Sequence, residues 1–357
     1  MKNSPLQDFK IIDLASVLAG PMTANMFSEL GANVLRIENV KTHGDSTRTW
    51  LREGEQYDEH VSSYHASVNY NKTILQKDLS LPDEHQWLMQ ELEDADVLIG
   101  NFSPIVQEKL NLRLADIRKT YPKLIVGWIS TYPDNRNRPA YDAVLQAETG
   151  WMSINGEEGS PPLKLPVAVI DVFASHQLRT GILTALLHKQ SNQKGSLVEV
   201  FLVEAGLAAQ VNQSSYALNQ KVNPHPMGSA HPNICPYGDV VQCEGGDYLL
   251  FAVGTDAQYL RLAETLDDSR LLADSFLINP QRVIHRSSLI EILQEICKQH
   301  TALSLHEKLT AANIPCAQVR GILDAFNQRP NMTHKTVIDN TLFHAGKTTC
   351  FHLESNP

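Results

Sequence analysis

The first half of the chain alternates short apolar runs with segments of helical periodicity. Four runs read as buried strands: residues 9–14 (FKIIDL), 34–37 (VLRI), 96–100 (DVLIG) and 124–129 (LIVGWI). After the first run, Gly20-Pro21 opens a predicted helix that ends at Gly31, because proline suits the first turn of a helix and glycine its end. Strands that alternate with helices predict an α/β fold with an open, mostly parallel sheet.

The pattern changes in the second half of the chain. A long helix is predicted from about Val172 to Lys189, and a strand or strand-to-helix entry over residues 198–203 leads into a helix through Leu207 and Val211. Turn-forming residues then gather, and later segments predict strands at 248–253 and 316–319 and a helix at 288–299. We therefore predict a large Rossmann-like domain over 1–220, completed by 326–357, a linker over 221–240, and a smaller α+β domain over 241–325.

Composition narrows the class of protein. The chain has 357 residues, of which 42% are hydrophobic and 20% charged, as in ordinary globular proteins. Its formal net charge of −10 is spread along the sequence, which disfavours non-specific binding to nucleic acid, so we expect no nucleic-acid partner. The motifs GxGxxG and GxxxxGK[ST] do not occur, so a dinucleotide site or a P-loop is weakly supported.

Cysteine spacing and the N-terminus bear on compartment. The five cysteines include no CxxC pair, which suggests neither a disulfide framework nor a metal site. The N-terminus lacks the apolar region of a signal peptide, and no apolar run approaches the ~20 residues that span a bilayer. We expect a cytoplasmic protein with reduced thiols and no membrane partner.

One aspartate occupies a position with two possible roles. The apolar run 166–170 (PVAVI) ends at Asp171, where the long helix begins. Aspartate is a favoured N-cap residue, and its charge suits the positive end of the helix dipole. A carboxylate can also act as a covalent nucleophile, with backbone N–H groups at a helix start stabilising the oxyanion that forms. The residues alone leave both roles open.

Three further polar segments carry candidate chemistry. The segment NYNK (69–72) is either a turn with a solvated Lys72 or a cationic contact for phosphate. NFSP (101–104) follows a strand and is either an ordinary turn or part of a ligand site at the carboxyl end of a parallel sheet. In GDSTR (44–48), Arg48 is either a surface charge or a clamp for a carboxylate.

Taken in order, these segments resemble the class III (CaiB/BaiF) coenzyme A transferase family, which includes formyl-CoA and succinyl-CoA transferases. The resemblance is carried by ASVLAGP (15–21), FSELGANVLRIE (27–38), GDSTR, NYNK, NFSP, AYDAVLQAETGWMSING (140–156), GSAHPNICPYGDV (228–240) and IPCAQV (314–319). Asp171 falls where the family keeps its catalytic aspartate.

The resemblance implies an acyl-CoA:carboxylate CoA transferase. Asp171 would attack the donor thioester and carry the acyl group, with a CoA thioester as substrate and no permanently bound cofactor. Small dicarboxylates such as succinate are the expected acids, with Arg48 as their partner. The fold implied is a large open α/β domain with a small domain, in a homodimer of interlocked rings. The residues implied to lie along the CoA site are Val17, Leu18, Ala19, Asn69, Lys72, Asn101, Phe102, Lys109 and Tyr141.

Two alternatives stay open beside the transferase. Formyl-CoA transferases carry glutamine where Leu18 stands, which argues against oxalate–formate exchange. A 2-methylacyl-CoA racemase of this family needs two proton-transfer groups and carries histidine where this chain has Tyr141-Asp142. A tyrosine of ordinary pKa is a poor base at neutral pH. A non-catalytic acyl-CoA-binding homologue is the other alternative, and turnover distinguishes it from the transferase.

Overall fold

The computed structural model describes residues 4, 6–55 and 61–351 of the chain, which fall into two compact units. The first contains the described residues of Met1–Trp151, Lys164–Val222 and Arg329–Pro357. The second contains Met152–Leu163 and Asn223–Gln328. Residues 152–163 and the later part of the predicted 221–240 linker thus belong to the second unit.

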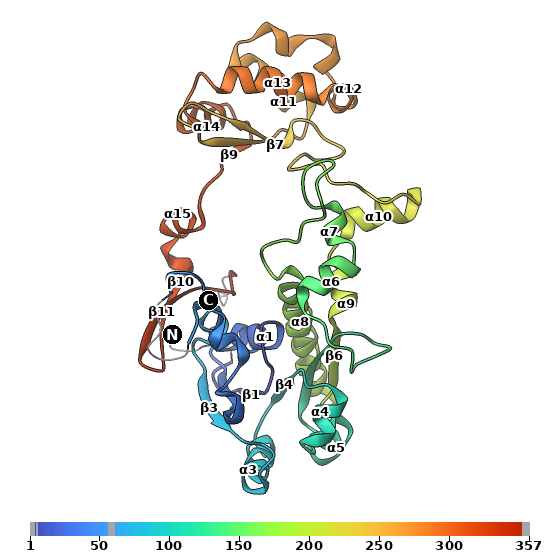
Figure 1. Ribbon diagram of the computed structural model, residues 1–357, viewed down its shortest axis with the longest axis vertical. Helices are drawn as coiled ribbons and strands as arrows, with labels where there is room; N and C mark the ends of the chain where they lie inside the picture. Colours follow the sequence, from blue (N-terminus) through green and yellow to red (C-terminus); the bar gives the residue numbers. More distant parts are fainter. Residues whose placement is uncertain (1–3, 5, 56–60, 352–357) are drawn as a thin grey trace. The chain divides into compact units, whose positions relative to one another are not determined.

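The first unit is built on a six-stranded sheet in which every pairing is parallel (Figure 1). Its order is β3-β2-β1-β4-β5-β6, so the strand order reverses between β1 and β4, and the loops after these two strands open the crevice where such sheets bind ligands. The α/β class with a mostly parallel sheet is confirmed. The strands are β1 (Lys10–Asp13), β2 (Asn33–Asn39), β3 (Thr73–Lys77), β4 (Val97–Gly100), β5 (Ile125–Ser130) and β6 (Leu197–Phe201).

Helices cover both faces of this sheet because successive strand residues point to opposite sides. Ile11 belongs to the core under α1 and α8, whereas its neighbour Ile12 belongs to the core under α3 and α5. At Gly127 of β5 a Cβ would lie 2.8 Å from Ile182 Cδ1 of α8, so glycine permits this close approach. The helices of the first unit are α1 (Ala19–Glu29), α2 (Ser63–Ala66), α3 (Pro82–Glu93), α4 (Pro104–Lys109), α5 (Leu114–Thr120), α6 (Asp142–Glu148), α8 (Val169–Asn192), α9 (Leu202–Ala208) and α10 (Val211–Gln220), and α7 (Trp151–Ile154) joins the units.

Several elements differ from the prediction. Helix α8 begins at Val169, three residues before the predicted start, and the helix expected through Leu207 and Val211 is divided between α9 and α10. Short 3-10 helices η1 (Val40–Thr42) and η2 (Ser46–Thr49) follow β2. Strand β3 was not predicted, because its mixed pattern TILQK shows no clear apolar alternation.

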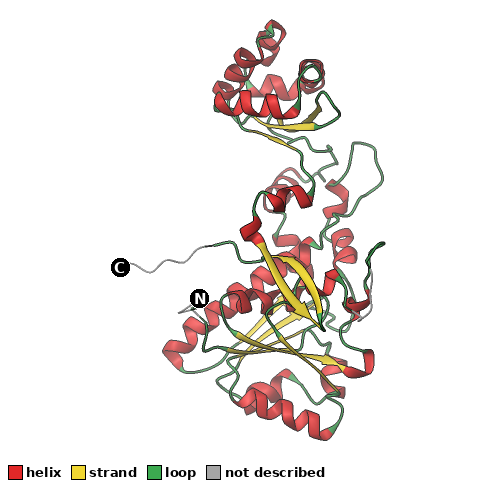
Figure 2. Ribbon diagram, turned by 90° about the vertical axis from the view of Figure 1, so that its left-hand side faces the viewer, coloured by secondary structure: helices red, strands yellow, loops and turns green. Residues whose placement is uncertain are grey.

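The first unit is completed by a hairpin late in the chain, β10 (Thr333–Ile338) and β11 (Thr341–Gly346), which follows η5 (Pro330–Met332). Its two-residue turn, Asp339-Asn340, has positive φ at both positions, which Asp and Asn tolerate well. The two strands of the hairpin are among those drawn in yellow in Figure 2. Its residues Ile338 and Phe343 pack against Val61 and Ala66.

The second unit has its own core. Its antiparallel sheet runs in the order β7-β8-β9, with β7 (Tyr237–Gln242), β8 (Tyr248–Ala252) and β9 (Cys316–Gln318). The helices are α11 (Asp256–Leu266), α12 (Asn279–Ile284), α13 (Arg286–Cys297), α14 (Ala302–Ala311) and α15 (Ile322–Asn327), with η3 (Ser269–Leu272) and η4 (Asp274–Phe276). Among all described residues, none of the helices has the length and apolar character needed to cross a bilayer.

Candidate active site

Asp171 lies in the first turn of α8, two residues after the helix begins at Val169. Another element caps this helix. Oδ1 of Asp142, the first residue of α6, accepts hydrogen bonds from the backbone N–H groups of Ile170 (2.8 Å) and Asp171 (3.4 Å). The N-cap interpretation of Asp171 is therefore wrong, since Asp142 fills that role.

The other N–H groups at the start of α8 are also occupied. Val169 N donates to Val167 O (2.8 Å) and Val172 N to Ala168 O (3.0 Å). All four N–H groups that begin the helix thus have partners. The expectation that this helix start stabilises an oxyanion is wrong for these groups, because none is free to donate.

The Asp171 carboxylate itself has no hydrogen-bond or ion-pair partner within the described part of the chain, although the residue is only 7% exposed. Burial and, as the smaller cause, the nearby charge of Asp142 together raise the pKa of this carboxyl from an ordinary 3.8 to about 7. A buried carboxylate without a partner, placed in a cavity, is a strong candidate for chemistry.

Two cavities meet at Asp171, with volumes of about 530 and 320 Å³. Val17, Leu18 and Tyr141 line both of them together with Asp171. The carboxylate is therefore accessible from two separate spaces, which suits a group that receives one substrate and passes its acyl group to another.

The larger cavity has an aromatic wall. The rings of Trp50 and Tyr64 meet edge to face with centroids 5.1 Å apart, and those of Trp50 and Tyr141 do so at 6.4 Å. Burial, followed by the charge of Asp171, raises the pKa of Tyr64 to about 12, so this hydroxyl stays protonated near neutral pH. Lys164 is the one cation among the described residues that line this cavity.

The smaller cavity lies at the carboxyl ends of β1, β4 and β5, where the fold places ligands. Two arginines stand in its wall. Arg136 pairs with Glu199 (Nη2 to Oε2, 2.9 Å), and Arg138 pairs with Glu148. Both arginines lie in segment 130–139, and they keep exposed edges that an anionic ligand can reach.

The structure brings six of the nine predicted CoA contacts together around Asp171: Val17, Leu18, Ala19, Asn101, Phe102 and Tyr141. The Asn101 side chain is engaged internally. Its Oδ1 accepts from Ser16 N and its Nδ2 donates to Ser16 O, both at 3.0 Å. Asn101 therefore contributes to the cavity as a clamp on the loop after β1 as well as a wall.

Three predicted contacts lie elsewhere. Lys72 is fully buried, and its Nζ donates to Asp13 Oδ2 (2.9 Å), Pro21 O (2.8 Å) and Asn69 Oδ1 (3.0 Å). Burial lowers the pKa of Lys72 to about 8. The solvated-lysine interpretation is wrong, because Lys72 and Asn69 are both interior. Lys109, the last residue of α4, is exposed and lines neither cavity.

Arg48 is also buried, and internal carboxylates occupy its guanidinium. Nε donates to Glu38 Oε2 and Nη1 to Asp339 Oδ2, each at 2.6 Å. The surface-charge interpretation of Arg48 is wrong, since the residue is 3% exposed. Gly44 permits the arrangement, because a Cβ there would lie 2.5 Å from Arg48 Nε and from Glu38 Oε2.

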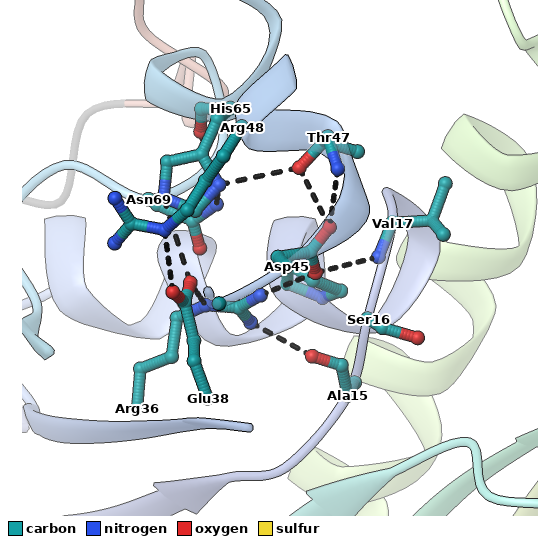
Figure 3. Close-up of polar contacts among 12 residues, drawn as sticks. Ala15, Ser16, Val17, Arg36, Glu38, Asp45, Thr47, Arg48, His65 and Asn69 are labelled. Carbon is teal, nitrogen blue, oxygen red and sulfur yellow. Dashed lines mark hydrogen bonds and ion pairs between the residues drawn. The ribbon is translucent and has the colours of Figure 1, made fainter. Parts of the chain in front are cut away.

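Arg48 and Lys72 belong to a buried ionic cluster, of which Figure 3 labels Arg36, Glu38, Asp45 and Arg48. Its centre is Arg36, which bonds to Asp13 Oδ2 (3.0 Å), Glu38 Oε1 (2.9 Å) and Asp45 Oδ2 (2.7 Å). We define the ionic cluster as the three cations and three carboxylates that bond to one another: Arg36, Arg48, Lys72, Asp13, Glu38 and Asp45. The cluster was not predicted, because charged residues in loop motifs look alike whether they face solvent, ligand or one another.

Comparison with known proteins identifies the chain. The sequence profile of CoA-transferase family III matches residues 6–353. The chain belongs to this family. It is 30% identical over 335 residues to the succinate–glutarate CoA-transferase of Agrobacterium fabrum, covering 91% of this chain and 82% of that protein. Against human succinyl-CoA:glutarate CoA-transferase the identity is 28% over 339 residues, with coverages of 94% and 76%.

A solved structure agrees with the family assignment. The CaiB/BaiF family protein from Brucella suis is 27% identical and superposes with a TM-score of 0.85, covering 99% of this chain and 94% of its own. The predicted family and the prediction that this is a CoA-transferring enzyme are confirmed. In this family III transferase, the site features that sequence reasoning missed are the aromatic wall, Asp142, Lys164 and the two arginines.

Proposed function

We propose that this family III enzyme moves CoA from an acyl-CoA donor to a small carboxylic acid through covalent intermediates on Asp171. The observation that carries the proposal is the Asp171 carboxylate, which has no partner among the described residues and lines two cavities at once. A group that is buried but unpaired keeps its lone pairs available for a substrate carbon.

The proposed reaction has four balanced steps. An Asp171 oxygen attacks the thioester carbon, and the C–S bond breaks to give a mixed anhydride and CoA thiolate. The thiolate attacks the aspartyl carbonyl and releases the donor acid, leaving an aspartyl-CoA thioester. The acceptor carboxylate then attacks this thioester, which restores a mixed anhydride and thiolate. Finally the thiolate attacks the acceptor's carbonyl and frees Asp171.

Each attack produces an oxyanion that needs hydrogen-bond donors. Because the start of α8 is occupied, the start of α1 is the better candidate. Helix α1 begins at Ala19 without a side-chain cap, and Leu18 and Ala19 line the smaller cavity with Asp171. Pro21 has no N–H and Met22 N donates to Leu18 O (2.8 Å), so the candidate donors of this first turn are the N–H groups of Ala19 and Gly20, at a helix end where an anion is favoured.

The smaller cavity suits the CoA arm. It continues from Asp171 along the ends of three parallel strands, and Arg136 and Arg138 stand in its wall. Both arginines hold carboxylates at the surface, and a phosphate can share or replace such partners. The larger, aromatic cavity then holds the acyl group and the acceptor acid.

For the acid, we propose a short dicarboxylate recognised by Lys164. The relatives from Agrobacterium fabrum and human are named for succinate, succinyl-CoA and glutarate. Arg48, the cation first expected to bind such an acid, is engaged by Glu38 and Asp339. Among the described residues Lys164 Nζ donates a hydrogen bond only to a backbone carbonyl, Leu165 O at 3.3 Å, and it can pair with a carboxylate remote from the reacting one.

Trapping the intermediate tests the proposed reaction. Purified enzyme is incubated with succinyl-CoA and other short acyl-CoAs plus hydroxylamine, and peptides are mapped by mass spectrometry. We expect a hydroxamate or CoA adduct at Asp171, present in the control Asp116→Ala and absent from Asp171→Ala. CoA binding without adduct or turnover for any donor would favour the non-catalytic homologue instead.

Substrate selectivity tests Lys164 separately. For Lys164→Met we expect the KM of dicarboxylate acceptors to rise roughly tenfold, from the loss of one ion pair, with the KM of monocarboxylates unchanged. Lys119→Met removes an exposed charge from α5 and is the matched control. Equal effects of Lys164→Met on mono- and dicarboxylates would refute the dicarboxylate assignment.

We also propose a homodimer, because α10 exposes large apolar side chains. None of its residues is buried, and the apolar side chains of Val211 and Leu218 are 72% and 78% exposed. A helix that exposes such side chains is typical of an interface. Light scattering of the native protein should give twice the chain mass, and Leu218→Glu should shift it toward the monomer. A monomeric native protein would contradict this proposal.

A further inference from the structure

The loop after β1 contains a backbone conformation that is costly for its residue. Val17 has φ of 71°, in the left-handed region. A β-branched residue is a rare occupant of this region, because its Cβ crowds the backbone, so the surrounding structure must hold it there. Val17 and Leu18 are also wall residues of both cavities beside Asp171. The strained residue is therefore part of the site.

Buried side chains hold successive peptide groups of this loop. Arg36 Nη1 donates to Ala15 O (2.8 Å), and Asn101 clamps Ser16 on both sides. Val17 N donates to Asp45 Oδ2 at 3.0 Å (Figure 3). Asp45 is the side chain that bonds directly to the strained residue, and it comes from a segment 28 positions away.

Both carboxylate oxygens of Asp45 accept further hydrogen bonds. Arg36 Nη2 bonds to the same Oδ2 (2.7 Å), while Oδ1 accepts from Thr47 N (2.9 Å) and Thr47 Oγ1 (2.7 Å). Asp45 is 7% exposed. Burial alone would raise its pKa, but the charge of Arg36 and the Thr47 hydrogen bonds lower it below its ordinary value, so the acceptor stays ionised. A charged acceptor with fixed partners is a strong and rigid support.

We propose that Asp45 is a positioning residue of the transfer reaction, which holds Val17 in its left-handed conformation and so places Leu18 opposite the Asp171 carboxylate. This inference rests on the proposed function. Asp45 touches neither cavity and acts through Val17. Small displacements of a wall beside the reacting atoms lower the rate of the chemical step more than they weaken the binding of a large substrate.

Glu38 offers a matched comparison for Asp45. It is a buried carboxylate of the same ionic cluster and bonds to the same arginine, Arg36 Nε at 2.9 Å. Within the described part of the chain its other partners are Arg48 and His65, and neither belongs to the loop after β1. Substituting Glu38 therefore disturbs the cluster without removing a bond to Val17.

The experiment compares Asp45→Ala with Glu38→Gln, in the wild type and in Val17→Gly. Thermal unfolding, kcat, KM and the rate of adduct formation at Asp171 are measured for each. We expect both single variants to lose stability, but Asp45→Ala to lower kcat roughly 10- to 100-fold with little change in KM, and Glu38→Gln to lower it less than about threefold.

Glycine at position 17 provides the decisive readout, because glycine adopts positive φ without support. Relative to Val17→Gly alone, adding Asp45→Ala should lower kcat less than about threefold, which a merely structural role of Asp45 would not produce. Should Asp45→Ala fail to fold, Asp45→Asn replaces it, since its single acceptor oxygen cannot serve both Val17 and Thr47.

Two outcomes would overturn the inference. Equal loss of kcat in Asp45→Ala and Glu38→Gln, or an equal Asp45 effect in both backgrounds, overturns the positioning role while a wild-type adduct at Asp171 leaves the proposed function standing. Absence of an adduct from the wild-type enzyme under every donor overturns the proposed function, and the positioning role falls with it.

Discussion

The carboxylates of the ionic cluster and the carboxylate of Asp171 are all buried in the first unit, yet their ionisation is pushed in opposite directions. Burial alone would raise the pKa of Asp13, but Lys72 and Arg36 lower it below its ordinary value. The same balance lowers the pKa of Glu38. At Asp171 no cation opposes burial, and the pKa rises to about 7. These carboxylates are buried to a similar extent, so the charges around each one decide the direction of its pKa shift.

This difference separates carboxylates that are paired within the protein from one that is available for reaction. In the ionic cluster every carboxylate is neutralised, and its oxygens are committed to the protein. Asp171 retains its lone pairs at the cost of an unpaired buried charge. A nucleophile must be incompletely satisfied by its own protein, whereas a positioning group must be fully satisfied.

The strongest way to break this comparison is Asp171→Asn, which removes the proposed nucleophile and the unpaired charge together. Turnover should fall by roughly 10⁴-fold or more, measured as steady-state kcat. The free energy of unfolding, in contrast, should be higher in this variant than in the wild type at a pH above about 7. Because the folded-state pKa of Asp171 lies above the ordinary 3.8, ionisation of this carboxyl destabilises the fold. The free energy of unfolding of the wild type should therefore fall as the pH rises from about 4 through about 7.

Urea denaturation of the same variant and of the wild type at two pH values checks the prediction about stability. Asp171→Asn should be more stable than the wild type at about pH 8, by as much as a few kcal/mol, with the difference gone below about pH 4. A variant that is less stable than the wild type at both pH values would show that the carboxylate is satisfied after all.

The converse change is Arg36→Met in the ionic cluster. It leaves three buried carboxylates short of a partner, so the free energy of unfolding should fall by about 3–5 kcal/mol, measured by urea denaturation. Arg113→Met breaks an exposed pair with Asp116 and should change stability little. Similar losses in the two variants would mean that burial adds nothing to the cluster's contribution.

A smaller effect sharpens the origin of the Asp171 shift. Attack requires the ionised carboxylate, so kcat/KM for the acyl-CoA donor should decline about tenfold per pH unit below an apparent pKa of about 7. Asp142→Asn removes the neighbouring charge and should move this midpoint downward, but only in part, because burial is the larger cause. An unmoved midpoint would exclude Asp142 as a contributor.

Much of the fold follows from local pattern. The strands β1, β4 and β5 are continuous apolar runs, as expected when both faces of a parallel sheet are covered. Helix α1 begins and ends near its proline and glycine. In contrast, β7 starts inside turn-rich sequence, and its Asp239 is stabilised by Arg286, a partner 47 residues away. Contacts between residues so far apart in the sequence leave no pattern near either residue from which they can be predicted.

The site was predictable where resemblance supplied it and not where packing decides. Asp171 and the loop residues around it were placed by family motifs. The interior positions of Arg48 and Lys72 were not, since their partners lie up to 291 residues away. Motif reasoning placed the loop after β1 at the site but did not predict its backbone conformation. The loop takes positive φ at Val17, where glycine-rich loops of similar sheets use glycine.

Gly346, the last residue of the hairpin, and Thr348 line the larger cavity, and Glu29 holds this segment through Thr348 Oγ1 (2.8 Å). In the order of translation, the ribosome makes the sheet and Asp171 first and the whole of Asn223–Gln328 next. The last wall of the cavity leaves the exit tunnel only afterwards. A nascent chain therefore carries the proposed nucleophile in an unfinished chamber, whose last wall is made only after the whole of the second unit.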